Sequence, residues 1–145
     1  MTDTLIPATT TDGGALATGR VVQVIGPVID VEFPVGSLPE INFLLTLVRE
    51  IEGESVQIAL EVAQHIGSGV VRAIAMKATD GVRRGQEVTN TGAPITVPVG
   101  PGILGHVYNV LGEPLDCDKS EIQASDHWPI FTSFLGNTSG TLRSE

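Results

Sequence analysis

Apolar and polar residues alternate along much of this chain, which is the pattern of half-buried β-strands. Ile29, Val31 and Phe33 occupy every second position of one such stretch. Asp30 and Glu32 stand between them, so the two sets point to opposite faces of a strand. We therefore expect the apolar set to face a core and the acidic pair to face water.

The alternation returns in a second stretch, where one face carries Val56, Ile58, Leu60 and Val62. Burying each such side chain contributes roughly 1.5–3 kcal/mol. This strand is predicted to be central to the core.

Turn-forming residues divide the rest of the chain into short segments, as expected from 17 Gly and 9 Pro. Turns are predicted at 26–27, 52–55, 67–69, 79–81 and 90–92. Strands are predicted at 20–25, 28–33, 56–62, 70–76, 86–89 and 95–97. Residues 41–51 are ambiguous, because Phe43-Leu44-Leu45 has no clean period and fits a turn of helix before a strand that ends at residues 49–51.

This spacing, with no helix between the strands, predicts a mainly β fold. Residues 19–98 are expected to form a small closed antiparallel barrel or a sandwich. Ile103 to Val110 is apolar and is followed by Gly112 and Pro114, so we predict a short helix there, within an otherwise irregular segment. Residues 1–18 lack apolar periodicity and are expected to form a disordered arm.

Charge and cysteine usage exclude some classes of function. The net charge of −9 disfavours binding to nucleic acid or to an anionic membrane surface. The single cysteine, Cys117, suits a reducing, cytoplasmic compartment. The sequence has no apolar run of the length needed to cross a bilayer, so we expect no direct membrane insertion.

Metal-ligating residue types are present without a recognised motif. His65, His106 and His127 show no pairwise metal spacing, so structural or exposed roles are favoured over a zinc site. Asp116, Asp118 and Glu121 lack the glycine and the spacing of a calcium loop and are interpreted as a hydrated linker.

Five segments resemble the β subunit of the rotary, proton-translocating ATP synthase. They are residues 19–33, 60–65, 78–85, 91–100 and 104–116, and their order and spacing also agree with that family. The run Glu61-Val62-Ala63-Gln64-His65 resembles β subunits in particular. The resemblance implies that residues 99–130 are an incomplete leading segment of a nucleotide-binding domain and that 131–145 are a divergent tail.

No residue of this chain matches a catalytic or nucleotide-binding residue of the family. Its members bind Mg-ATP or Mg-ADP through a loop of the form Gly-x-x-x-x-Gly-Lys-Ser/Thr. The only lysines, Lys77 and Lys119, do not follow a glycine. We therefore expect no catalytic, cofactor-binding or metal-binding residue and no activity from this chain alone.

The resemblance implies an assembly role instead. In the family this barrel joins a six-membered crown with α subunits, on a cytoplasmic head that is peripheral to the inner or plasma membrane. The expected partners are the α subunit and other head subunits. The alternatives are a non-functional truncated gene product and a stand-alone β-barrel binding module.

Overall fold

The computed structural model describes residues 16–51 and 53–131. Most of the predicted arm (1–18) and almost all of the predicted tail (131–145) lie outside the described residues. The described chain forms two compact units, which divide between Pro94 and Ile95.

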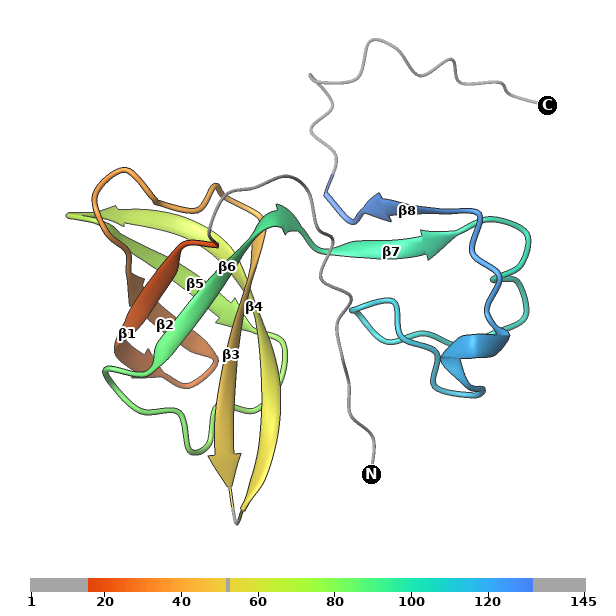
Figure 1. The fold of residues 1–145 in the computed structure, drawn as a ribbon, viewed down its shortest axis with the longest axis horizontal. Helices are drawn as coiled ribbons and strands as arrows, with labels where there is room; N and C mark the ends of the chain where they lie inside the picture. Colours follow the sequence, from red (N-terminus) through yellow and green to blue (C-terminus); the bar gives the residue numbers. More distant parts are fainter. Residues whose placement is uncertain (1–15, 52, 132–145) are drawn as a thin grey trace, which may run out of the picture. The chain divides into compact units, whose positions relative to one another are not determined.

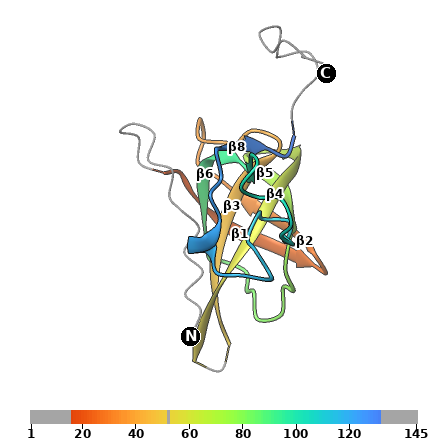
Figure 2. The same ribbon diagram turned by 90° about the vertical axis from the view of Figure 1, so that its right-hand side faces the viewer.

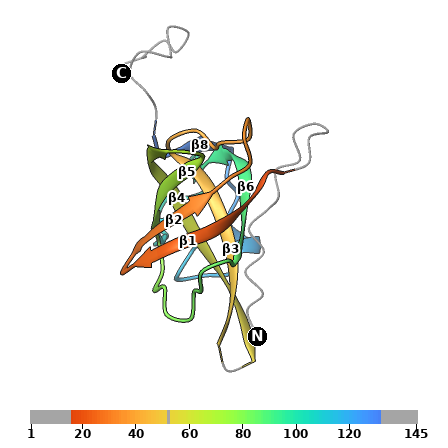
Figure 3. The same cartoon turned by 90° about the vertical axis from the view of Figure 1, so that its left-hand side faces the viewer.

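The first unit is a closed barrel of six antiparallel strands (Figure 1). Its strands are β1 (Thr18–Ile25), β2 (Val28–Glu32), β3 (Phe43–Ile51), β4 (Glu54–Gly67), β5 (Val70–Ala75) and β6 (Glu87–Pro94). Their order around the barrel is β1-β2-β5-β4-β3-β6, and the pairing of β6 with β1 closes it. Figure 3 shows β1 and β2 in front, crossing β3 and β4 behind them. The predicted closed barrel is confirmed. The outer half of the β3–β4 hairpin extends beyond it, because residues 47–51 and 54–58 pair only with each other.

Short turns join the barrel strands where the sequence predicts them. Ile25 pairs with Val28, so only two residues connect β1 to β2. Gly26 has φ = 56° there, a value that glycine adopts without strain. The β4–β5 turn is the predicted 67–69 segment, in which Ser68 has φ = 54°. In the ambiguous segment 41–51, residues 41–42 form a turn and β3 begins at Phe43, so Phe43-Leu44-Leu45 is strand and not a turn of helix.

The core forms from the apolar faces of the predicted strands. Ile29 and Val31 are fully buried and Phe33 nearly so. The face of β4 predicted to be central contributes Ile58, Leu60 and Val62, which are also fully buried.

The polar face of β2 differs from the prediction. Glu32 is exposed, but only 5% of Asp30 is accessible. Asp30 lies opposite Arg72 of β5 in the strand register. The guanidinium donates two hydrogen bonds to the Asp30 carboxylate, at 2.8 and 2.9 Å. A cross-strand partner allows the burial of a carboxylate that would otherwise need water.

The end of β6 also departs from the prediction. No turn interrupts the chain at 90–92, because β6 continues to Pro94. Its pairing with β3 shifts register between Phe43 and Leu45, so the glycine is accommodated in an irregularity rather than a turn. Gly92 has φ = 72° and donates a backbone hydrogen bond to the Asn90 side chain.

The second unit contains a two-stranded antiparallel sheet of β7 (Thr96–Val99) and β8 (Asp126–Pro129). The segment 95–97, predicted as a barrel strand, belongs largely to β7 and pairs with β8 instead. The short 3-10 helix η1 (Lys119–Glu121) is the blue helical turn in Figures 1 and 2.

The helix predicted over Ile103 to Val110 is wrong, because this segment consists of turns and isolated bridges. Pairing with the chain that follows residue 112 satisfies its backbone groups instead. Among the described residues, no helix has the length and apolar character needed to cross a membrane.

Candidate functional site

A hairpin-like loop in the second unit brings together residues that are distant in sequence. The Asn109 amide donates to the Glu113 carbonyl at 2.9 Å, and the Leu115 amide donates to the Val107 carbonyl at 2.8 Å. Tyr108 and Pro114 form a bridge between these two pairs. Continuing the same register places residue 106 opposite residue 116.

The tip of this loop explains why the chain turns there. Three residues, 110–112, connect the two arms, and Gly112 has φ = 73°. A three-residue connection with glycine in the left-handed region is a common hairpin turn. The Asn109 side-chain oxygen accepts hydrogen bonds from the amides of Leu111 (2.9 Å) and Glu113 (3.0 Å). The Asn-x-x-Gly-Glu pattern thus sets the register of the arms.

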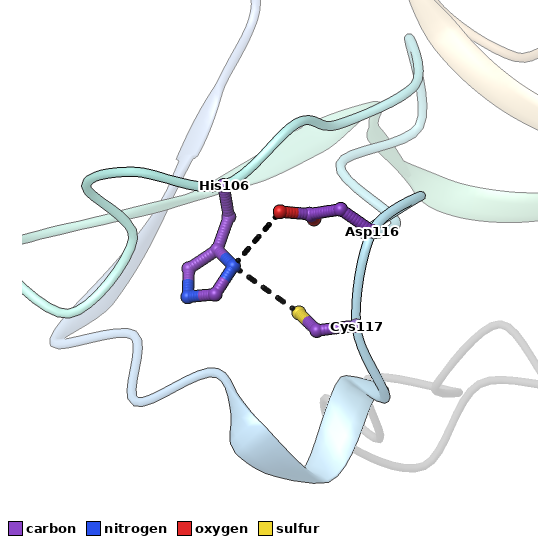
Figure 4. A group of neighbouring side chains, drawn as sticks. All are labelled: His106, Asp116 and Cys117. Atoms are coloured by element: carbon purple, nitrogen blue, oxygen red, sulfur yellow. Dashed lines mark hydrogen bonds and ion pairs between the residues drawn. The ribbon is translucent and has the colours of Figure 1, made fainter.

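The register produces a cluster of His106, Asp116 and Cys117 (Figure 4). His106 Nδ1 lies 3.1 Å from Asp116 Oδ2 and 3.3 Å from Cys117 Sγ. The three potential ligand atoms of the cluster, one from each residue, all lie within 4.8 Å of one another. The other carboxylate oxygen, Asp116 Oδ1, accepts a hydrogen bond from the Val107 amide at 3.1 Å. That bond holds the carboxylate with Oδ2 towards the imidazole.

The electrostatics of the cluster favour an ionised aspartate and a protonated thiol. The Val107 amide is the main cause that lowers the pKa of Asp116, and the hydrogen bond with His106 adds to it. Desolvation raises the pKa of Cys117, and the negative charge of Asp116 raises it further. The thiolate is therefore disfavoured unless a positive charge is supplied to the cluster.

This geometry differs from that of a nucleophilic triad. A Cys–His–Asp relay uses both imidazole nitrogens, one facing the nucleophile and the other facing the carboxylate. Here Asp116 and Cys117 both lie at Nδ1 of His106. A carboxylate, an imidazole and a sulfur that converge on one point are instead typical ligands of a transition-metal cation.

The remaining residues considered from sequence lie elsewhere. His65 Nε2 lies 2.7 Å from the Pro39 carbonyl oxygen. His127 is exposed on β8. Asp118 and Glu121 flank and end η1, and both are exposed.

The sequence interpretation missed the cluster because it compared the histidines only with one another. His106 and Asp116 are ten positions apart, a spacing that is uninformative without a register. The signal was available in the turn residues: centring a hairpin on the Asn109–Glu113 turn pairs position 106 with 116.

A second feature of the barrel is a set of exposed apolar side chains in the β2–β3 connection and at the end of β4. We call it the loop-end patch, and it consists of Val35, Leu38, Ile41 and Ile66. The first three lie in the β2–β3 connection and the last in β4. The Asn42 amide donates to the Val62 carbonyl at 2.8 Å, and this bond ties the connection to β4. Exposed apolar residues on one connection can supply contacts to a partner.

These features define the first unit as a small, closed, six-stranded barrel domain with exposed apolar side chains in the β2–β3 connection. Residues 21–92 match the family model described as ATP synthase alpha/beta family, beta-barrel domain. This segment is therefore the N-terminal barrel domain of an ATP synthase alpha/beta family protein.

Proposed function

We propose that this chain acts as an assembly module, joining its barrel to the barrels of neighbouring subunits in the catalytic head of an ATP synthase. The observation that carries the proposal is the family match over residues 21–92, which spans the strands of the barrel from β1 to β6.

The architecture of the barrel supports a side-chain interface. Where the barrel is closed, each strand is paired on both sides, so association at that surface would use side chains on the outside of the barrel. The loop-end patch supplies exposed apolar side chains for that purpose, including Val35, which is fully exposed.

The finer assignment is to a β-type subunit with an α-type neighbour. It rests on the resemblance of the run from Glu61 to His65 to β subunits. The family context would place the chain in a peripheral head complex, attached to a membrane only through its partners.

The proposal gives these 145 residues no nucleotide-binding role, since their sequence contains no Gly-x-x-x-x-Gly-Lys-Ser/Thr loop. Isothermal titration with Mg-ATP is expected to show no saturable heat. Micromolar binding would overturn this part of the proposal.

The assembly role is tested by capture of the chain on an immobilised α-type subunit. We expect the unmodified chain to be retained, and we expect Val35→Glu and Ile41→Glu to weaken retention by placing a charge in an apolar contact. Ile25→Glu is the matched control, because Ile25 is about as exposed as Ile41 but lies at the end of β1, beside the start of β2 and away from the β2–β3 connection. Failure of the unmodified chain to bind would contradict the assembly role. Equal losses in all three variants would reject the loop-end patch as the contact surface.

A further inference from the structure

We propose that His106, Asp116 and Cys117 form a binding site for a zinc-class divalent cation. The site lies in the second unit and is independent of the assembly role proposed for the barrel. Its ligand atoms would be His106 Nδ1, Asp116 Oδ2 and Cys117 Sγ.

Two of the three separations between the ligand atoms, those from His106 Nδ1, are close to the values of tetrahedral coordination. Zinc binds nitrogen and oxygen at about 2.0–2.2 Å and sulfur at about 2.3 Å. Tetrahedral angles then place neighbouring ligand atoms roughly 3.2–3.7 Å apart. The observed values of 3.1 Å (nitrogen to oxygen) and 3.3 Å (nitrogen to sulfur) are close to this range. His106 would therefore need little movement relative to either partner to bind an ion with them.

Without an ion, hydrogen bonds can hold the cluster together. His106 Nδ1 can donate its proton to Asp116 Oδ2, and the Cys117 thiol can donate to the same carboxylate. A cation at the centre would accept lone pairs from all three groups at once.

The loop around the cluster supplies the support that a metal site requires. The Val107 amide bonds to Asp116 Oδ1 and leaves Oδ2 to face the imidazole. Outer hydrogen bonds of this kind orient metal ligands and raise affinity. The hairpin pairing on either side of Tyr108 and Pro114 fixes the spacing of the two arms.

The choice of cation follows from the ligands. A thiolate and an imidazole favour zinc and similar transition metals over magnesium or calcium, which prefer oxygen ligands only. Three protein ligands leave a fourth position for water or an external group. The bound ion would link the two arms of the loop.

The first experiment uses the full, untagged and reduced chain, titrated with Co²⁺ as a spectroscopic substitute for zinc. We expect one equivalent to bind, with a thiolate-to-cobalt charge-transfer band and visible bands typical of four-coordination. Zn²⁺ should displace the cobalt, whereas Mg²⁺ should not. Absence of the charge-transfer band would overturn the proposal.

Variants then assign the ligands. Cys117→Ser should abolish the charge-transfer band, and His106→Ala and Asp116→Asn should weaken cobalt binding by about tenfold or more. His127→Ala and Asp118→Asn are matched controls, since both residues are exposed and outside the cluster. Equal effects of ligand and control variants would contradict the assignment.

A further measurement needs no substitution and so does not depend on how a variant folds. Cys117 is the only cysteine, so alkylation by iodoacetamide reports on that thiol alone. Zn²⁺ should slow its alkylation by about tenfold or more, and EDTA should restore the rate. An alkylation rate unchanged by Zn²⁺ would overturn the site.

Discussion

At the scale of single residues, Asp30 departs most clearly from the rule that polar positions of an alternating strand face water. Its two hydrogen bonds from Arg72 replace hydration. These bonds also lower the pKa of the Asp30 carboxyl, with burial opposing them. The alternation correctly separated the two faces of β2, but the partner on β5 depends on a strand pairing that the sequence does not state.

We predict that Asp30→Asn destabilises the barrel at neutral pH. Hydrogen bonds to charged groups are worth about 1.5–3 kcal/mol, and we expect the lower end because 40% of the Arg72 side chain is exposed to solvent. Since the folded state lowers the pKa of Asp30, this stability is present above the carboxyl's unfolded pKa. It is lost as the pH falls through the folded pKa.

Urea unfolding at neutral pH and at acidic pH measures this difference. The two proteins should converge in stability in acid. Glu32→Gln is the control, since Glu32 is the exposed acid on the same strand, and it should change stability by less than about 0.5 kcal/mol. Equal effects of the two substitutions at neutral pH would show that the Arg72 pairing contributes nothing.

At the scale of elements, the sequence predicted the barrel strands and most of the turns between them, and its errors lie after residue 89. Alternation and flanking glycines located the β1–β2 and β4–β5 hairpins because both signals are local. The apolar segment Ile103 to Val110 misled the prediction for the opposite reason. Its apolar residues fit a helical stretch, but its backbone pairs with the arm beyond Gly112.

The candidate site exists only because this segment is a hairpin arm and not a helix. A helix over 103–110 would give His106 no fixed relation to residues 116 and 117. Reading Asn109 to Glu113 as a hairpin turn places them together. The residue types in the sequence therefore show which side chains could bind a metal ion. The hairpin pairing decides whether those side chains lie close together.

At the scale of the whole molecule, the proposed assembly role belongs to one compact unit and the proposed metal site to the other. The barrel unit carries the family match and the loop-end patch. The second unit carries the His106–Asp116–Cys117 cluster and the β7–β8 sheet. Because the two proposals rest on different units, loss of metal binding need not affect assembly.

The central claim is that this chain assembles with an ATP synthase partner, and native mass spectrometry tests it most directly. The chain has a mass of 15.2 kDa, which identifies each bound copy. Mixed with an α-type subunit, it is predicted to give complexes whose mass equals that of the α-type subunit plus one or more copies of this chain. Spectra that contain only the separate chain and the separate α-type subunit would contradict the account.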